Sequence, residues 1–473
     1  MSKKHHHRSR REFLGQLTTG CASLGITTML SSMTNMSLLN ASANCNLNFS
    51  SNSDYKALVC ILLNGGNDSY NMLIPRGSEG EYEDYSTVRS NLAIPQDQIL
   101  PINPINHIDR SLGLHPNLIG IQSLFDSQKL SFIANAGALV QPTSLSEFRN
   151  NTNLPLGLFS HSDQRQHWQT SVPQDRDALG WAGRMTDLLN ANNPSPNVGL
   201  NVSLSGLNVF QRGNLIDTTT LSPNGNGAIL INNSTNNGFS ETLKRQTIDN
   251  LLDQNYVNIL EQAYAGTVTG SKANSLVIDN AISSIPDFTT TFPDTNFGRR
   301  MRMIAKVIAA QDILGLQRQT FFISMGGYDT HDDILDIHGA LMSELDTVLS
   351  AFYNVLDQEL MISDKVTTFT ASEFSRRLVS NGDGSDHAWG GHSIVMGGGI
   401  QGGHIFGQYP DLYEGNSLDI GQGRIIPTTS CDEIFAEMAL WFGASSSDLD
   451  LILPNLQNFW DYRSSTPPLG LYI

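Results

Sequence analysis

The sequence predicts an α/β protein, in which helices cover both faces of a mostly parallel central sheet. Its apolar segments each end in glycine or polar residues, and we expect strands in five of them: residues 56–71, 130–139, 320–331, 365–377 and 392–403. The apolar residues are continuous rather than alternating, which is typical of strands buried on both faces of a parallel sheet. Helical patterns separate these segments, and such alternation predicts a three-layer sandwich.

The first predicted strand covers residues 57–63 and runs into Asn64-Gly65-Gly66-Asn67-Asp68. The second ends near Gly137, and the third, TFFISMGGYDTH, passes through two glycines into Asp329 and His331. The fourth is KVTTFTASEFSRR and the fifth is HSIVMGGGIQGG. A helical period predicts helices over residues 115–128, 299–317, 339–361 and 431–443.

Two segments depart from this alternation. Residues 190–240 are rich in Asn, Ser, Gly and Pro, which favours loops and small strands, and residues 265–298 resemble a long connection. We therefore predict one large α/β domain over residues 54–473, with a loop-rich insertion or cap at about 190–298.

The N-terminus has the pattern of an export signal. Arg10 and Arg11 precede a weakly apolar, Ser- and Thr-rich stretch, and the small residues ASA at 41–43 fit a cleavage site. We interpret residues 1–43 as a twin-arginine signal peptide, the alternative being an uncleaved membrane anchor. The protein is then expected to be exported, to the periplasm or beyond the cell.

The charge balance excludes some classes of partner. The formal net charge is −17, and residues 1–43 hold more bases than acids, so cleavage would make the chain more acidic. Such a surface argues against nucleic acid or anionic lipid as partners and is compatible with divalent cations. No other apolar run is long enough to span a bilayer. Cleavage would leave Cys45, Cys60 and Cys431, enough for one bridge at most, and the pairing of Cys45 with Cys60 stays open.

Ligand-type side chains follow or precede the predicted strands. In a parallel α/β sheet, ligands bind beyond the carboxyl ends of the strands, so these side chains are expected at one edge. Carboxylates and imidazoles in such a mixture suit a divalent metal, with zinc expected first and calcium, magnesium or manganese as alternatives. The candidate metal ligands are Asp68, Asp329, His331, Glu373, Asp386, His387 and His392.

Several of these residues have a simpler explanation. The Asp68 side chain could form a hydrogen bond with the backbone of its own turn, and Asp329 could cap the following helix. Capping does not explain His331, whose side chain falls on the same side as Asp329 in an extended backbone. Glu373 could be a ligand or support one.

A candidate nucleophile lies in GLFSHSDQRQHWQ, residues 157–169. A hydroxyl beside a metal loses its proton more easily, so Ser160 and His161 are candidate catalytic residues. The alternative is that Ser160 caps a helix, and the two roles are compatible because helix N-termini also bind anions. Arg165 and Arg376 are candidate substrate-binding residues that could steady an oxyanion.

Taken together, these motifs resemble a known family. The chain resembles exported bacterial proteins grouped as domain of unknown function 1501, which are placed in the alkaline phosphatase and sulfatase superfamily. Besides the paired arginines, the resemblance is carried by the motifs LLNGGNDSYNMLIP, LGLHPNL, FSHSDQRQHW, GGYDTHDD, FTASEFSRR, DHAWGGHSIVMGGGIQGG and GQYPDL, which span residues 56–410. The resemblance implies an alkaline-phosphatase-like fold.

The resemblance also implies roles for single residues. Asp68 corresponds to the first metal-binding aspartate of the superfamily, and Ser160 occupies the place of the nucleophile. Asp329 and His331 resemble the paired Asp and His after a middle strand, and His387 or His392 would be the late histidine. One departure is Phe374, because Glu373-Phe374 stands where the superfamily often has Asp-His. Either one metal is bound, or Asp386-His387 supplies the missing pair, or the chemistry has been lost.

The resemblance and the ligand-type residues predict an exported, metal-dependent hydrolase of phosphate or sulfate esters, acting on a small-molecule or glycan ester. The alternative is a non-catalytic secreted or periplasmic binding protein that retains the fold, with or without a structural metal. A third interpretation is a metal-dependent transferase.

Overall fold

The computed structural model describes residues 54–77, 80–106, 109–190, 200–216, 218–227, 238–461, 463–464 and 466–472. The described residues belong to one compact unit, Ser53–Ile473. The predicted signal peptide at residues 1–43 and Cys45 lie outside them. Cys60 and Cys431 are both buried.

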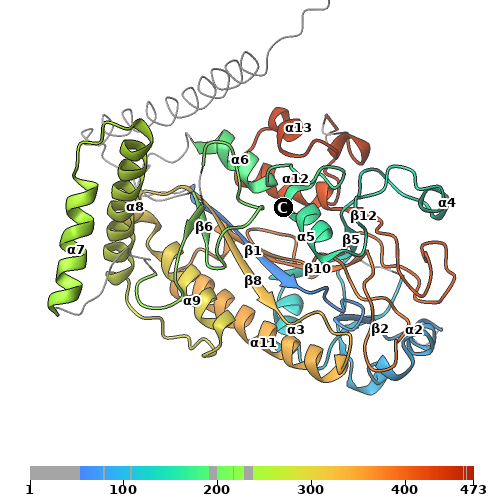
Figure 1. Ribbon diagram of the computed structural model, residues 1–473. Helices are drawn as coiled ribbons and strands as arrows, with labels where there is room; N and C mark the ends of the chain where they lie inside the picture. The colour runs from blue at the N-terminus through green and yellow to red at the C-terminus, as the bar shows by residue number, and fades with distance from the viewer. Residues whose placement is uncertain are drawn as a thin grey trace, which may run out of the picture. The chain divides into compact units, whose positions relative to one another are not determined.

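The centre of the fold is a large sheet (Figure 1). Among the described residues it has nine strands, eight of which lie in the order β11-β5-β10-β9-β1-β8-β6-β7, while β12 pairs with β5. Neighbouring strands are parallel except at β10, which is antiparallel to both β9 and β5. The bounds are β1 (Lys56–Asn64), β5 (Leu130–Gly137), β6 (Asn201–Ser203), β7 (Thr218–Thr220), β8 (Arg318–Gly326), β9 (Val366–Ala371), β10 (Gly391–Gly397), β11 (Ile405–Phe406) and β12 (Thr429–Ser430).

All five predicted strands belong to this sheet, so the predicted α/β class with a mostly parallel sheet is confirmed. The strand β1 lies at the centre, where Ala57 is in register with Gln319 of β8 on one side and Val366 of β9 on the other. Seven consecutive residues of β1, 57–63, are buried. This burial explains why apolar residues are continuous rather than alternating along the strand.

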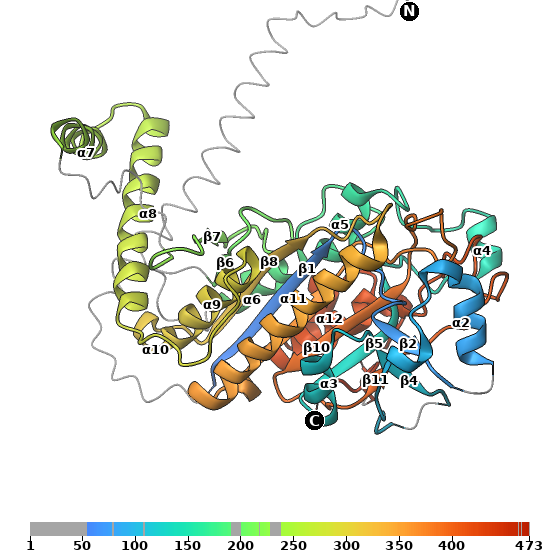
Figure 2. The same ribbon diagram turned by 90° about the horizontal axis from the view of Figure 1, so that it is seen from below.

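Alternate side chains of the sheet enter two cores, one on each face. Val59 of β1 packs in the core formed with α3 (Ile119–Asp126), α9 (Asn296–Ala309) and α11 (Ile334–Asn354). Cys60, the next residue, packs in the core formed with α6 (Trp181–Leu189) and α12 (Cys431–Phe442). Figure 1 shows α9 and α11 below the sheet and α6 and α12 above it, and Figure 2, seen from below, shows α11 lying along β1. The three predicted layers are therefore present.

The predicted helices are found with shifted ends. The helix expected over 299–317 is divided into α9 and α10 (Gln311–Leu314), and it stops at Gly315, whose φ of 66° is the left-handed conformation of a helix C-terminus. The helix expected from residue 339 begins five residues earlier, at Ile334, and continues as a π-helical turn over Val355–Glu359.

The region predicted to be a loop-rich insertion has more regular structure than its composition suggested. The strands β6 and β7 extend the main sheet beside β8. The helices α7 (Phe239–Leu252) and α8 (Ile259–Ser283) follow, so the stretch expected to be a long connection at 265–298 is helical as far as Ser283. Within the described residues, no helix is both long enough and apolar enough to cross a bilayer.

The remaining elements lie around the sheet and in the loops. A small antiparallel sheet has the order β2-β4-β3. These elements are β2 (Leu73–Pro75), β3 (Leu100–Pro101), β4 (Leu112–Leu114), α2 (Glu81–Arg89), α4 (Leu145–Arg149), α5 (His161–Thr170) and α13 (Leu449–Ile452).

The topology brings four loops to one edge of the sheet. The strands β1, β8 and β9 are parallel neighbours, so the loops that follow them leave at the same edge. Because β10 is antiparallel to β9, the loop that precedes β10 reaches this edge too. The segments around residues 65–68, 327–331, 372–377 and 385–390 therefore meet there, as expected for an α/β sheet.

Candidate metal centre

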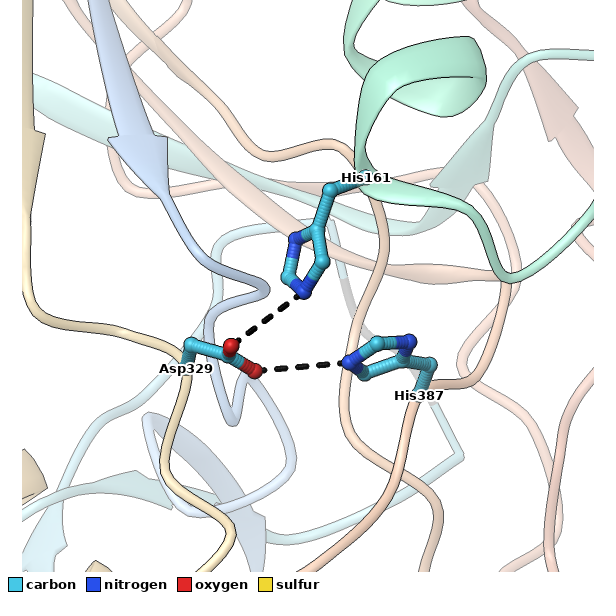
Figure 3. Close-up of side chains that lie close together, drawn as sticks. All are labelled: His161, Asp329 and His387. Atoms are coloured by element: carbon cyan, nitrogen blue, oxygen red, sulfur yellow. Dashed lines mark hydrogen bonds and ion pairs between the residues drawn. The ribbon is translucent and has the colours of Figure 1, made fainter.

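Three ligand-type side chains converge at this edge. One ligand atom from each of His161, Asp329 and His387 lies within 4.8 Å of the other two. Asp329 Oδ2 is 3.3 Å from His161 Nε2, and Asp329 Oδ1 is 3.3 Å from His387 Nε2. Figure 3 shows one carboxylate oxygen of Asp329 facing each imidazole. The three residues come from the first turn of α5, the loop after β8 and the loop before β10.

A third imidazole adjoins this group. His331 Nε2 lies 3.1 Å from Asp329 Oδ1 and 3.1 Å from His387 Nε2. The predicted proximity of Asp329, His331 and His387 is therefore seen in the structure. His161, predicted as a catalytic residue, joins them in a position suited to a ligand.

Each of the three imidazoles has an oxygen atom at its other nitrogen. His161 Nδ1 lies 3.1 Å from Glu373 Oε1, and His387 Nδ1 lies 2.7 Å from the carbonyl oxygen of Phe159. His331 Nδ1 lies 3.4 Å from Asp386 Oδ1. Such oxygen partners fix the tautomer and the orientation of metal-binding histidines. Here all three present Nε2 toward Asp329.

The Phe159 carbonyl settles which nitrogen of His387 carries hydrogen. A carbonyl oxygen only accepts, so Nδ1 must donate and the neutral ring has no hydrogen at Nε2. This unprotonated nitrogen faces a carboxylate oxygen 3.3 Å away, so neither atom can donate a hydrogen bond to the other. Burial lowers the pKa of His387, which favours the neutral ring. A cation between the two atoms would remove the repulsion.

Asp329 is held from behind by Arg376, whose Nη2 donates to Asp329 Oδ1. Burial alone would raise the pKa of Asp329, but the hydrogen bond and charge of Arg376 outweigh it and leave the pKa below its usual value. The backbone of Asp329 also lies close to the loop after β1. A Cβ on Gly65, whose φ is +127°, would be 2.3 Å from the Asp329 nitrogen, so only glycine fits.

The structure places Arg376 differently from the expected substrate-binding role. Its side chain is completely buried. The guanidinium donates to the carbonyl oxygens of Gly65, Gly66, Tyr328 and Ser385, with Gly66 O and Ser385 O each at 3.0 Å. These bonds join the loops after β1, β8 and β9 behind the cluster. Arg376 therefore acts as a positioning residue.

Glu373 and Asp386, expected as ligands or supports, lie behind the histidines. The carboxylate of Glu373 is fully buried and accepts from the Gly65 nitrogen at 2.9 Å as well as facing His161. Asp386 Oδ2 is 2.8 Å from Arg377 Nη2. Burial would raise the pKa of Asp386, but its hydrogen bond to Asn381 and the charge of Arg377 lower it. Both acids therefore orient rings in this structure.

Asp68 and His392 were expected as ligands, and the structure places both outside the cluster. Asp68 forms a fully buried ion pair with Arg89. His392 is buried, accepts at Nδ1 from the Asn135 nitrogen at 3.1 Å, and stacks on Tyr409 with ring centroids 4.8 Å apart. Burial lowers the pKa of His392 to about 3, so the ring is neutral. The sequence placed these residues near strand ends correctly, but it could not give the direction of their side chains.

Ser160 is the N-cap of α5, which is the simpler of its two expected roles. Its Oγ accepts from the Asp163 nitrogen at 3.5 Å and lies 3.0 Å from Ser162 Oγ. The cap brings Ser160 next to His161 at the helix start. Arg165, the other expected substrate-binding residue, lies half-buried in α5.

Phe374 packs against the cluster. Its ring stacks on His387 with centroids 4.5 Å apart, and its centroid is 4.9 Å from that of His161. The side chain is 2% exposed. An apolar ring therefore covers the imidazoles of His161 and His387 on this side.

The donor set of imidazole nitrogens and a carboxylate could hold a divalent metal. Zinc favours nitrogen and oxygen donors at about 2.0–2.2 Å in a tetrahedron, which sets neighbouring donors roughly 3.3 Å apart. The separations between Asp329 oxygens and the three Nε2 atoms are 3.1–3.3 Å in the structure. His161, His387 and Asp329 could thus hold one ion, and His331 adjoins them through Asp329 and His387.

Two groups at the site could not be predicted from the sequence. The Phe159 carbonyl carries no sequence signal, because every residue has a carbonyl. Phe159 itself has a φ of +70°, unusual for an aromatic residue, and the turn this permits precedes the Ser160 cap. Arg424, whose Nε donates to the His387 carbonyl oxygen at 2.9 Å, lies beyond the motifs that span residues 56–410.

Comparison with known proteins identifies the family. The model of the family described as "Protein of unknown function (DUF1501)" matches residues 55–422, so the chain belongs to this family. No curated protein matches the chain. Among solved structures, the phosphonate monoester hydrolase SpPMH from Silicibacter pomeroyi is similar with a TM-score of 0.33 and 8% identity, over 83% of this chain and 74% of that chain. A likeness at this level carries no argument about activity.

Proposed function

We propose that this protein is a metal-dependent hydrolase of phosphate or sulfate esters that uses one cation, zinc first among the candidates. The observation that carries the proposal is a pair of hydrogen-bond acceptors that face each other in the cluster. The bare Nε2 of His387 faces a carboxylate oxygen of Asp329 at 3.3 Å, and the oxygen partners of the rings hold this arrangement in place. Neutral nitrogens aimed at a carboxylate are the donors of a zinc site.

The chain's own residues divide the work. Asp329 and the three imidazoles would hold the cation, which supplies positive charge for the ester anion and lowers the pKa of a nearby hydroxyl or water. Glu373 and Asp386 orient the rings, and Arg376 keeps Asp329 in place.

Ser160 is the proposed nucleophile, because it adjoins His161 at a helix N-terminus that favours anions. On this proposal Ser160→Ala keeps its metal and loses turnover. If the variant keeps turnover, a water is the nucleophile instead.

The ester class rests on the motifs that resemble the alkaline phosphatase and sulfatase superfamily, and with them we propose an alkaline-phosphatase-like fold. The same resemblance, with Arg10 and Arg11 near the start of the chain, supports export by the twin-arginine pathway to the periplasm or beyond. A small-molecule or glycan ester is the proposed substrate.

The test compares zinc-loaded and chelator-treated protein on p-nitrophenyl phosphate, phosphonate and sulfate esters. Turnover is expected only with metal, and Asp329→Asn is expected to abolish both bound metal and turnover. Asp126→Asn, at the exposed end of α3, is the matched control and should leave both unchanged. Full turnover by Asp329→Asn would refute the proposal.

A second function is favoured by one observation, the buried Phe374 ring against His161 and His387. A protein that keeps the metal but lacks the groups for ester hydrolysis would be a binding protein. Bound metal in the wild-type chain with no turnover of any ester in the panel would support it.

A further inference from the structure

A cavity of about 410 Å³ lies beside the histidine cluster. This volume is within the range of roughly 300–1,000 Å³ that is usual for small-molecule sites. Its wall consists of Phe148, Phe159, His331, Asp386, His387, Ile420 and Arg424. Two of the proposed metal ligands thus form part of the wall, so a molecule in the cavity would touch the candidate metal centre.

One part of the wall is apolar. Phe148 belongs to α4, Phe159 precedes α5 and Ile420 belongs to the loop before β12, and all three are half-buried. The Phe148 ring packs on Trp389 with centroids 6.5 Å apart. Side chains that are fixed and still partly exposed bind a flat apolar group favourably, because the group removes their remaining surface from water.

The cavity also has a fixed cation. Arg424 Nε donates to the His387 carbonyl at 2.9 Å, and Nη1 donates to Gln422 Oε1 at 3.0 Å. The guanidinium carbon lies 5.6 Å from the centroid of the Phe159 ring. These contacts hold the guanidinium against the aromatic wall, beside a proposed metal ligand. A pre-organised guanidinium suits a phosphate or sulfate oxygen.

The acid in the cavity wall does not cancel this preference. Asp386 is paired with Arg377, with 2.8 Å between Oδ2 and Nη2, and its other oxygen lies 3.4 Å from His331 Nδ1. The negative charge of Asp386 is therefore partly neutralised by Arg377. Asp386 and Asp419 also act on the charge of Arg424, and its guanidinium still lines the cavity, where it can bind an anion.

We propose that this cavity is the subsite for an aromatic group of the ester, and that Arg424 binds the ester's anionic oxygens. The substrate class is then an aryl ester of phosphate or sulfate. The proposal rests on the proposed function, since it places the ester next to His331 and His387. It adds the recognition of the leaving group, which the metal centre alone does not determine.

The test is calorimetric binding of two stable anions, phenylphosphonate and methylphosphonate, to the whole chain with and without zinc. Phenylphosphonate is expected to bind at least about tenfold more tightly. Ile420→Ala should weaken phenylphosphonate binding about fivefold and leave methylphosphonate unchanged. Its matched control is Ile313→Ala, an exposed residue of α10, which should change neither.

Arg424 is tested separately. Arg424→Gln should weaken both anions by about tenfold, because each carries the phosphonate oxygens. Arg302→Gln, on the surface of α9, is the control and should have no effect. Phe148→Ala gives a second test of the apolar wall, with the same expected selectivity as Ile420→Ala.

Equal affinity for the two anions, no binding of either, or equal losses in Ile420→Ala would each overturn the subsite. The outcome is separate from that of the hydrolase proposal. Turnover of the esters without any preference for phenylphosphonate would support the hydrolase proposal and refute the subsite proposal. A preference for phenylphosphonate without turnover of any ester would support the subsite proposal and refute the hydrolase proposal.

Discussion

At the scale of single residues, three histidines share one arrangement. The Nδ1 atoms of His161, His331 and His387 face Glu373, Asp386 and the Phe159 carbonyl, and their Nε2 atoms face Asp329. The oxygen partners matter because a free imidazole can present either nitrogen. A ring that is held in one tautomer loses less freedom when it binds a metal, so these partners should contribute to affinity.

Glu373 gives the clearest test of this contribution. Glu373→Gln keeps the size of the side chain but replaces the carboxylate next to His161 Nδ1 with an amide. We expect zinc affinity to fall by about tenfold, with the fold retained, because the ring is held less firmly. Competition with a chromophoric chelator measures the affinity.

Glu414→Gln, at an exposed loop position, is the matched control for Glu373→Gln. Equal affinity in the Glu373 variant and the wild type would show that the carboxylate does not support the ring.

Gly65 tests the backbone that surrounds Asp329. In Gly65→Ala the new Cβ would lie 2.3 Å from the Asp329 nitrogen, at a φ of +127°. We expect a loss of at least about 2 kcal/mol in the free energy of unfolding, together with weaker zinc binding, because the loop must move. Urea unfolding and zinc titration measure the two effects.

Gly80→Ala separates backbone strain from the steric clash. Its φ is +89°, but nothing lies within 4 Å of the added Cβ. It should lose stability without losing zinc affinity. If the two glycine variants behave alike, close packing against Asp329 has no role.

At the scale of elements, the strand ends could be predicted better than the side chains. Continuous apolar runs identified β1, β5, β8, β9 and β10, because burial on both faces leaves a clear pattern. The antiparallel direction of β10 could not be predicted, since direction depends on how loops cross between strands. That direction brings His387 to the same edge as Asp329.

Site membership was harder to predict than strand position. Asp68 and Asp329 both follow strands, yet only Asp329 joins the imidazoles, because Arg89 pairs with Asp68 in the interior. Arg89 lies at the end of α2, 21 residues after Asp68, and no local sequence pattern predicts this pair. The residue types of the site were therefore predictable, and the division between ligands and supports was not.

The helix α12 supplies a prediction on pH. Burial raises the pKa of Asp432, in its first turn, to about 7, from an ordinary value of 3.8. Between these pH values the unfolded chain has lost this proton and the folded chain still holds it, so stability falls as pH rises. The Asp432 contribution is complete below about pH 4 and is lost by about pH 7.

Asp432→Asn should remove that fall. Relative to wild type, the variant should gain up to about 1.4 kcal/mol per pH unit between pH 4 and 7. Urea unfolding at several pH values measures the difference, with Asp97→Asn as an exposed control. Parallel curves for wild type and Asp432→Asn would show that Asp432 ionises normally in the folded chain.

At the scale of the whole molecule, the two cores and the site depend on the same sheet. The helices α9 and α11 pack on one face and α6 and α12 on the other, which buries both sides of β1. Because helices pack on both faces of the sheet, the strands are held firmly and the loops at their ends are held at one edge. Polar groups that would destabilise a core are gathered at this edge, where some of them, such as Asp329, remain exposed to solvent.

The most direct test of the account is the metal content of the whole chain. Protein purified with added zinc and then dialysed should retain about one zinc per chain by elemental analysis, and His387→Ala should retain almost none. A wild-type chain that emerges without metal, or a His387→Ala chain with as much zinc as wild type, would contradict the central claim that these imidazoles and Asp329 hold a cation.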